Sequence, residues 1–397
     1  MNKGKIPKRR FKEFQNADAW EQRKLSEISD VRDGTHDSPK YVEQGHPFIT
    51  SKNISDGSIN YDDVQYISNG DFEEINKRSK VDINDILMGM IGTIGNIALI
   101  RTEPNFTIKN VALIKDTKQV DYLYLYNYLQ SMSVEHQLAN CMDGGTQKFI
   151  ALGKIRQLEI MIPSEQEQVG IGHYLDSLDN LITLHQRKLE KLKNLKLAYL
   201  SEMFPAEGER KPKRRFSGFT GDWEQRKLGE VVEITMGQSP SSKNYTENPN
   251  DHILVQGNAD MKNGHVVPRV WTTQITKQAE KGDLILSVRA PVGDIGKTDY
   301  DVVLGRGVAA IKGNSFIFQL LTKMKINGYW ARFSTGSTFE SINSDNIKNA
   351  QISIPSLREQ EKIGGLFNEF DSLIALHQRK LEKLQNLKKA YLNEMFV

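Results

Sequence analysis

Residues 182–204, ITLHQRKLEKLKNLKLAYLSEMF, return near the end of the chain as residues 374–396, IALHQRKLEKLQNLKKAYLNEMF. The two copies are identical at 19 of 23 positions. Apolar residues in both copies are spaced alternately by four and three, a pattern that predicts long helices that each require a partner helix. Since a duplicated helix finds its natural partner in its own copy, we expect the two to pack antiparallel, as a coiled coil related by a pseudo-two-fold axis.

The two long helices are predicted over residues 164–204 and 356–397. Each begins at an Ile-Pro-Ser sequence, and both Ser-x-x-Glu spacings, Ser164 with Glu167 and Ser356 with Glu359, are typical of a capping box. A helix over residues 164–204 would be about 60 Å long at 1.5 Å per residue. The seam that we expect to hold the helices together, and to serve assembly, contains Leu175, Leu178, Ile182, His185, Leu189 and Leu192 in the first copy and Phe367, Phe370, Ile374, His377, Leu381 and Leu384 in the second.

Polar residues interrupt this apolar seam. His185 and His377 occupy equivalent positions, and Lys196 and Lys388 follow further along. A histidine pair allows a metal site or a pH switch, but a single polar position in a seam more often sets the register of the two helices. We therefore interpret the histidines as register or seam-edge residues and predict no metal site.

Two shorter motifs are duplicated as well. Pro-Lys-Arg-Arg-Phe occupies residues 7–11 and 212–216, and Trp-Glu-Gln-Arg-Lys-Leu occupies residues 20–25 and 223–228. The globular parts between these motifs and the helices diverge strongly. We therefore predict a first globular domain over residues 1–163, which includes a basic N-terminal tail, a linker over 205–217 and a second domain over 218–355. Near-identical helices beside dissimilar domains favour a shared helical framework that carries two domains with different recognition properties. The alternative is neutral drift after a duplication.

Composition excludes several classes of protein. Cys141 is the single cysteine, so a disulfide framework or a cysteine-based zinc site within the chain is excluded, and a reducing cytoplasm fits. The N-terminus lacks the apolar stretch of a signal peptide, and the apolar run over residues 86–100 is too short and too glycine-rich for a membrane span. Net charge is +5 over residues 1–11 but −6 over residues 12–163, so charge alone does not indicate a nucleic-acid binder.

Catalytic motifs are missing from the sequence. It contains no Pro-Pro pair, so the Asn/Asp-Pro-Pro-aromatic loop of amino-methyltransferases is absent, and no His-Glu-x-x-His occurs. Residues 292–298 resemble the end of a phosphate-binding loop, but the residue before them is Pro291, where that loop needs glycine. Residues 305–310 match a loose dinucleotide pattern without a following helix, and Asp116-Thr117-Lys118 could be half of a nuclease set. We interpret the first as a turn between two strands, predict that the second does not bind a nucleotide, and interpret the third as a surface turn. We therefore predict that the chain is not an enzyme and binds no cofactor.

Polar loops follow the strand-like runs of both globular parts, which read as mixed α/β. Arginine and lysine can reach guanine edges or phosphates, and asparagine and glutamine pair well with adenine. The alternative is that these side chains are simply solvated. The candidate DNA-binding residues are Arg32, Thr35, His36, Lys40, Lys52 and Asn53 in the first domain and Gln238, Ser239, Lys243, Gln256, Asn258, Arg269, Arg289 and Arg306 in the second.

Taken together, these segments resemble the specificity subunit of type I restriction-modification systems. The resemblance covers nearly the whole chain. Its carriers are the Trp-Glu-Gln-Arg-Lys-Leu segments, the Ile-Pro-Ser helix starts, the repeated Leu-His-Gln-Arg-Lys-Leu-Glu-Lys-Leu helices, and domain segments such as Asp33-Gly34-Thr35-His36, Ser51-Lys52-Asn53-Ile54, 282–293 and 305–311.

The resemblance implies two target-recognition domains that each read one half of a bipartite, asymmetric double-stranded DNA sequence, with paired helices that fix the spacing. It also implies two partner modification subunits, which bind S-adenosylmethionine and methylate adenine, and a motor-nuclease subunit that uses ATP and Mg²⁺. The chain itself would be a non-catalytic, cytoplasmic subunit. Alternatives are a free-standing sequence-specific DNA-binding protein and a coiled-coil adaptor that reads no DNA.

Overall fold

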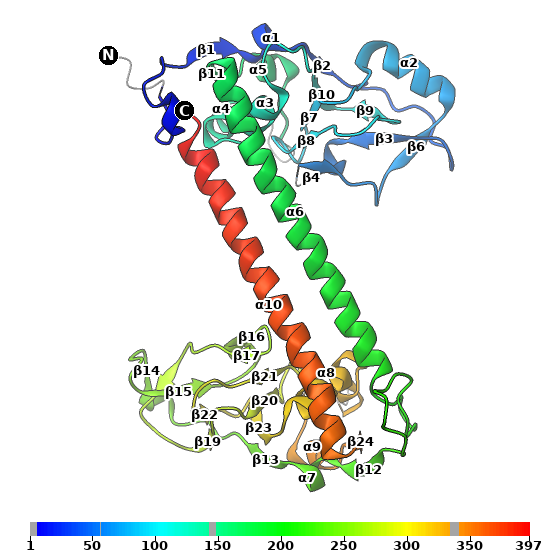
Figure 1. Ribbon diagram of the computed structural model, residues 1–397, viewed down its shortest axis with the longest axis vertical. Coiled ribbons are helices and arrows are strands. Elements are labelled where there is room, and N and C mark those ends of the chain that lie inside the picture. The colour runs from blue at the N-terminus through cyan, green and yellow to red at the C-terminus, as the bar shows by residue number, and fades with distance from the viewer. Residues whose placement is uncertain (1–5, 56, 143–147, 334–340) are drawn as a thin grey trace. The chain divides into compact units, whose positions relative to one another are not determined.

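The protein is described here by a computed structural model that covers residues 6–55, 57–142, 148–333 and 341–397 (Figure 1). It divides into two compact units. Unit 1 comprises Met1–Gln186 and Arg379–Val397, and unit 2 comprises Arg187–Gln378. Both contain helices and strands, so the predicted mixed α/β class with an internal repeat is confirmed. Among the described residues, no helix is long and apolar enough to cross a membrane.

Unit 1 is built around a four-stranded antiparallel sheet of order β2-β10-β7-β8, beside a three-stranded sheet of order β6-β3-β9 in which β3 and β9 run parallel. The strands are β1 (Glu21–Lys24), β2 (Val31–Asp33), β3 (His46–Thr50), β4 (Ile54–Ser55), β5 (Ser58–Ile59), β6 (Gln65–Ile67), β7 (Ile86–Gly89), β8 (Ile97–Leu99), β9 (Thr107–Lys109), β10 (Val111–Ile114) and β11 (Glu159–Ile162). The short helices are α1 (Leu25–Ile28), α2 (Asn69–Ser79), α3 (Tyr122–Tyr128), α4 (Met132–Cys141) and α5 (Leu152–Arg156).

Unit 2 repeats this plan with additions. Strands β13, β23, β20 and β21 correspond to β2, β10, β7 and β8, and β15 pairs in parallel with β22 as β3 does with β9. The strands are β12 (Glu224–Lys227), β13 (Glu233–Met236), β14 (Tyr245–Thr246), β15 (His252–Val255), β16 (Met261–Lys262), β17 (His265–Val266), β18 (Trp271–Thr272), β19 (Lys277–Ala279), β20 (Leu284–Ser287), β21 (Ile295–Lys297), β22 (Val302–Leu304), β23 (Val308–Lys312) and β24 (Gln351–Ile354). The helices are α7 (Leu228–Val231), α8 (Ser315–Ile326) and α9 (Ser344–Lys348).

The central sheets are buried on both faces. Side chains alternate along a strand, and a separate hydrophobic core covers each face. In β7, Ile86 and Met88 join the core that contains α3 and the long helices, whereas Leu87 joins the core shared with β3 and β9. In β20, Leu284 and Leu286 alternate with Ile285 in the same way. This placement explains why these strands read as continuous apolar runs.

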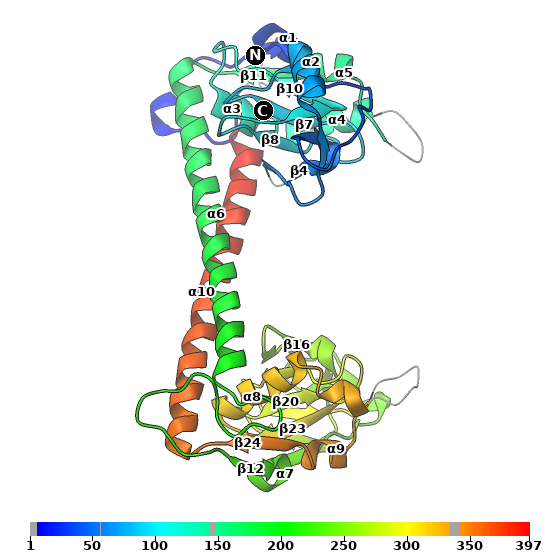
Figure 2. The same cartoon turned by 90° about the vertical axis from the view of Figure 1, so that its right-hand side faces the viewer.

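The two predicted long helices are α6 (Glu165–Glu202) and α10 (Leu357–Glu394), drawn in green and in orange to red in Figures 1 and 2. In unit 1, Tyr174 and Tyr391 have ring centroids 5.2 Å apart, and Asp179 Oδ1 lies 2.7 Å from Lys388 Nζ. From Tyr174 to Asp179 the chain advances along α6, while the partner residue in α10 moves back from Tyr391 to Lys388. The helices are therefore antiparallel in this unit.

Unit 2 contains the matching contacts between the other ends of the helices. Lys196 Nζ lies 2.6 Å from Asp371 Oδ1, and the rings of Tyr199 and Phe370 have centroids 5.5 Å apart. Lys196 and Asp371 are the repeat equivalents of Lys388 and Asp179. The polar positions that the sequence placed in the seam therefore form one duplicated pair of interhelical ion pairs. His185 and His377 are half-buried.

The capping boxes predicted at the helix starts do not form as expected. The backbone N–H of Glu167 donates to Ser164 Oγ at 3.4 Å, but its carboxylate accepts two bonds from Arg10 instead of reaching back to the serine, Nε–Oε1 at 2.6 Å and Nη2–Oε2 at 2.7 Å. In unit 2, Arg215 binds Glu359 in the same two-bonded manner, with both distances 2.7 Å. An arginine donates two charge-assisted bonds to a carboxylate, whereas the serine backbone N–H of a capping box donates one uncharged bond, which is why the arginine binds the glutamate.

The duplicated Pro-Lys-Arg-Arg-Phe motif thereby joins helix ends within each unit. Arg9 donates its backbone N–H to Glu394 O at 2.8 Å at the end of α10, while the neighbouring Arg10 binds the start of α6. In unit 2, Arg214 and Arg215 make the equivalent contacts with Glu202 and Glu359. Gly170 and Gly172 in α6, and Gly364 and Gly365 in α10, do not interrupt the helices. A Cβ at Gly172 would lie 2.7 Å from Asp121 Oδ1, so this glycine permits close packing on α3.

Candidate nucleic-acid interface

Four chain segments of unit 1 meet in what we term the first loop cluster, residues 34–38, 50–53, 90–96 and 109–110. Thr35 N–H donates to Ile108 O at 3.1 Å, and Asn110 N–H donates to Thr35 O at 3.2 Å. Ser51 Oγ donates to Asn110 O at 2.9 Å and accepts from Met90 N–H at 3.0 Å. The ends of β2, β3, β7 and β9 are thus bonded into one surface.

His36 is fixed in this cluster by both of its ring nitrogens. Nδ1 lies 2.7 Å from Asn110 Oδ1, and Nε2 lies 2.9 Å from Asp33 Oδ2. These bonds, with Asn110 first and Asp33 second, raise the pKa of His36 above its ordinary value, although nearby Arg78 opposes the shift. Asp33 also accepts from Arg78 of α2, so this helix helps to hold the loop.

The second loop cluster is the counterpart in unit 2 and comprises residues 237–239, 256–260, 288–294 and 305–307. Gln238 N–H donates to Leu304 O at 2.8 Å, and Arg306 N–H donates to Ser239 Oγ at 3.1 Å. Val288 N–H donates to Gly307 O at 2.9 Å, and Gln256 Nε2 donates to Tyr245 Oη at 2.8 Å. The scaffold therefore matches the first loop cluster, whereas the side chains differ.

A glycine at the same place in both clusters explains part of this scaffold. A Cβ at Gly34 would lie 2.3 Å from Ile108 O, and a Cβ at Gly237 would lie 2.0 Å from Gly305 O. No other residue tolerates such an approach of two backbones. The backbone at each glycine therefore packs directly against the segment that carries Asn110 or Arg306.

The structure brings together most of the predicted DNA-binding residues. Thr35, His36, Lys52 and Asn53 lie in the first loop cluster, and Gln238, Ser239, Gln256, Asn258, Arg289 and Arg306 lie in the second. Asn53 is 3% exposed, and its amide bonds Thr50, Asn60 and Asp63, so it shapes the loop.

The other predicted residues lie outside the clusters. Arg32 bonds Asp30 and Arg78 O, and Arg269 donates to Ala259 O at 3.0 Å, which supports the second loop cluster from behind. Lys40 and Lys243 are exposed at other positions. Asn110 was missed by the sequence reasoning, although a Lys-Asn pair between two apolar runs is a turn signal that could have revealed it.

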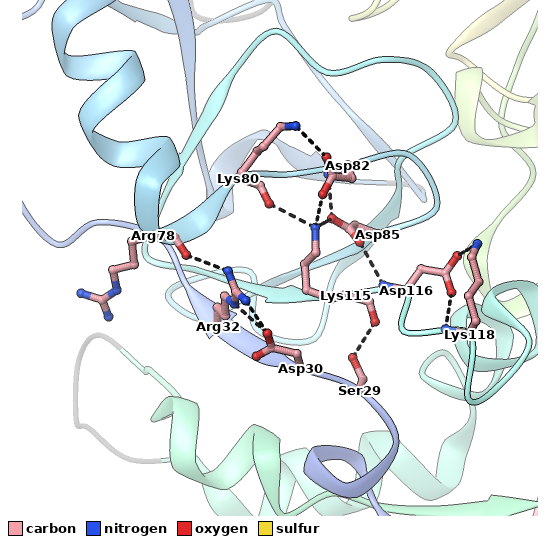
Figure 3. A network of polar contacts seen from close by, with 10 residues as sticks. All are labelled: Ser29, Asp30, Arg32, Arg78, Lys80, Asp82, Asp85, Lys115, Asp116 and Lys118. Atoms are coloured by element: carbon pink, nitrogen blue, oxygen red, sulfur yellow. Dashed lines mark hydrogen bonds and ion pairs between the residues drawn. The ribbon is translucent and has the colours of Figure 1, made fainter.

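Figure 3 shows the polar network around Lys115 and the predicted surface turn at Asp116-Thr117-Lys118. Lys115 Nζ lies 2.6 Å from both Asp82 Oδ2 and Asp85 Oδ2, and Lys118 pairs with Asp116. Burial alone would lower the pKa of Lys115, but its bonds to Asp82 and Asp85 outweigh burial and raise that pKa.

Unit 2 repeats the core of this network, since Lys312 pairs with Glu280, whose backbone N–H donates to Asp283 at 2.9 Å. The core of the network is therefore a scaffold feature that both units share. Among the described residues, no three acidic, histidine or cysteine side chains are placed to hold a metal ion. Residues 292–294 form the predicted turn between β20 and β21, and the rest of the phosphate-loop-like motif is mostly β21. Residues 305–307 connect β22 to β23.

Comparison with known families matches both halves of the chain. The family described as "Type I restriction modification DNA specificity domain" matches residues 17–194 and again 220–386. The chain belongs to this family. The resemblance found in the sequence is thereby confirmed, and recognition of a DNA sequence is the activity that this family membership implies.

Similar proteins include two specificity subunits of Methanocaldococcus jannaschii. The putative type I restriction enzyme MjaX specificity subunit is 28% identical over 395 residues, which cover 94% of this chain and 92% of the relative. The MjaVIII specificity subunit is 23% identical over 380 residues, 89% of each chain. Among solved structures, the type I restriction-modification S subunit from M. genitalium superimposes with a TM-score of 0.70 at 15% identity, over 99% of both chains, which confirms the fold.

Proposed function

We propose that this chain is a non-catalytic subunit that reads a bipartite, asymmetric DNA sequence, with one half-site bound by each loop cluster. The observation that carries the proposal is that the two clusters share one scaffold but present different side chains. A single scaffold held constant by Gly34 and Gly237 keeps the reading geometry, while the variable side chains select different bases.

The side chains suggest how each half-site is read. In the second loop cluster, Arg289 and Arg306 suit guanine edges or phosphates, and Gln238 and Gln256 suit adenine. At the repeat equivalents of Gln238 and Ser239, the first loop cluster presents Thr35 and His36 instead. We therefore expect the two half-sites to differ in sequence.

We further propose that the long helices dock two modification subunits, which carry S-adenosylmethionine, and that motor-nuclease subunits with ATP and Mg²⁺ join through that complex in the cytoplasm. Exposed leucines at equivalent positions support two equal docking sites. Leu181 and Leu184 of α6 are each 44% exposed, and Leu373 and Leu376 of α10 are 44% and 39% exposed. Solvent-facing leucines retained in both copies are typical of a surface that another helix covers.

The lengths of α6 and α10 are proposed to set the spacing between half-sites. A reader tethered to a second reader binds its half-site intramolecularly, which raises affinity and restricts the spacer. This role distinguishes the proposal from a coiled-coil adaptor, which would need no DNA contact.

The test is to co-express the chain with its modification subunit in a host that lacks adenine methylation and to map methylated adenines across the genome. One asymmetric sequence with a fixed spacer is expected, and it should vanish when the chain is omitted. Methylation without the chain, or methylation by the isolated chain, would refute the proposal. A double variant Leu184→Glu, Leu376→Glu should abolish methylation while the isolated chain remains folded, whereas Ser177→Glu, at an exposed position that differs between the copies, should not.

A further inference from the structure

Strands β1 and β12 carry the same four residues with the same exposure in both units, although the domains around them have diverged. Both read Glu-Gln-Arg-Lys, and both show the same order of exposed and half-buried positions. Glu21 and Glu224 side chains are 68% and 66% exposed, and Arg23 and Arg226 side chains are 39% and 38% exposed. The repeat therefore preserves a piece of surface.

The first turns of the long helices provide an internal measure of how far exposed positions have drifted. Between residues 165–180 and their equivalents 357–372, every position that is exposed in both copies has changed. These pairs are Glu165 and Leu357, Gln166 and Arg358, Val169 and Glu361, His173 and Gly365, Ser177 and Glu369, and Asn180 and Ser372. Four consecutive unchanged residues on β1 and β12 stand out against this drift.

Folding does not require that identity. In unit 1 the strand is anchored by the buried residues Trp20 and Leu25, at 1% and 0% exposure. Burial explains why these two residues are the same in both copies, but it does not explain the four residues between them. The exposed charges form pairs such as Arg23 with Glu27 at 3.1 Å. Exposed pairs of this kind contribute about 0–1 kcal/mol, and many other residues would serve as well.

The strands are also placed to meet another chain. Among the described residues, β1 pairs in a ladder only with β11 and β12 only with β24, so each is an edge strand. At the start of β12, Arg210 O accepts from Trp223 N–H at 2.8 Å and Glu209 O accepts from Gln225 Nε2 at 3.3 Å, so the edge is open from Arg226 onward. An edge strand can add an extended segment of a partner by backbone pairing, with side chains selecting the partner. Each strip combines a glutamate with an arginine and a lysine, so it suits a protein segment of mixed charge better than a uniformly anionic phosphate backbone.

We propose that β1 and β12 are two equivalent docking strips for an extended segment of the modification subunit, one copy on each unit. The segment carries a basic residue opposite Glu21 or Glu224 and acidic residues opposite the arginine and lysine that follow. This inference rests on the proposed function, and it adds a second contact to the leucine surface of the helices. Two identical strips fit two copies of one partner.

The experiment measures binding of the modification subunit to the full chain by native mass spectrometry for stoichiometry and by calorimetry for affinity. One variant carries Glu21→Arg, Arg23→Glu and Lys24→Glu, and the second carries Glu224→Arg, Arg226→Glu and Lys227→Glu. Each should weaken one of the two binding events by about tenfold or more, and the combined variant should weaken both. A matched control, Arg358→Glu with Glu361→Arg and Glu369→Arg, reverses three exposed charges at positions that differ between the copies and should bind normally.

The outcomes distinguish failure of the docking strips from failure of the proposed function. If the wild-type chain binds two modification subunits and the strand variants, shown to be folded by their unfolding temperature, bind them equally well, the docking strips are refuted and the proposed function stands. Loss of DNA binding by the strand variants, with normal binding of the modification subunit, would assign the strips to DNA and also refute the inference. A wild-type chain that binds no modification subunit would refute both.

Discussion

Two buried ion pairs show how single residues organise this protein. Arg10 and Glu167 side chains are 6% and 0% exposed, and Arg215 and Glu359 side chains are 16% and 1% exposed. Arg10 also donates to Ala17 O and Asp18 O, which fixes the segment that leads into β1. The duplicated Pro-Lys-Arg-Arg-Phe motifs therefore serve as internal clamps at the helix starts.

The clamp predicts a large effect for a single substitution. Arg10→Met leaves the Glu167 carboxylate buried without its partner, so we expect the free energy of unfolding of unit 1 to fall by about 3–5 kcal/mol. Arg9→Met is the control, because Arg9 and Glu394 side chains are 53% and 38% exposed, and it should cost less than about 1 kcal/mol. Denaturant unfolding of the variants checks this, and equal losses for both would contradict the account.

His36 predicts a pH dependence confined to unit 1. Its two nitrogens face oxygen atoms of Asn110 and Asp33, so both bonds form only when the ring is protonated. The folded-state pKa is raised, so this stabilisation of the loop is complete below the ordinary value of about 6.5 and is lost as pH rises through the pKa of His36 in the folded protein.

The measurement is amide hydrogen exchange of residues 34–38 against pH, together with an NMR titration of His36. We expect protection of this loop to fall with rising pH in the wild type and to be independent of pH in His36→Gln. The equivalent loop in unit 2, where Ser239 bonds Arg306 N–H, should show no such step. A loop equally protected on both sides of the titration would contradict the role of His36.

The paired helices show what can be predicted at the level of an element. Their existence, their antiparallel pairing and their bounds within two or three residues followed from the alternation of apolar residues in the repeat. The partners of Lys196 and Lys388 did not follow, because Asp371 and Asp179 are distant in the sequence and only the antiparallel register brings them together. The partner of the Glu167 carboxylate could not be predicted either, because Arg10, which binds it, comes from a different segment of the chain.

The loop clusters were predictable only in part. Strand ends and polar residues pointed to Thr35, His36, Gln238 and Gln256, because loops after strands carry binding residues. Arg32 and Arg269 were placed in the same set by residue type alone. In the structure, Arg32 bonds Asp30 outside the first loop cluster, and Arg269 is engaged with the backbone of the second cluster at Ala259 O.

The interhelical ion pairs carry a prediction at the same level. Lys388 and Asp179 side chains are 14% and 21% exposed, so Lys388→Met should lower the free energy of unfolding by about 2 kcal/mol. Exchanging the charges, as Lys388→Asp with Asp179→Lys, should recover part of that loss. A double-mutant cycle measures the coupling, and a coupling energy near zero would show that this ion pair does not stabilise the packing of the two helices.

At the level of the whole molecule, the proposed spacing role predicts the effect of lengthening both helices. Insertion of one heptad after Gln186 and one after Gln378 keeps the apolar seam in phase and adds about 10 Å of helix. We expect the spacer of the methylated sequence to lengthen by about three base pairs, or assembly to fail. A fully methylated target with the original spacer would show that the helices do not act as the ruler.

The central claim is that each unit reads its own half of the target. The most direct test replaces residues 12–163 with the first domain of another family member and maps adenine methylation in cells that contain the modification subunit. The account predicts that one half of the recognised sequence changes while the other half and the spacer remain the same. A change in both halves, or in neither, would contradict it.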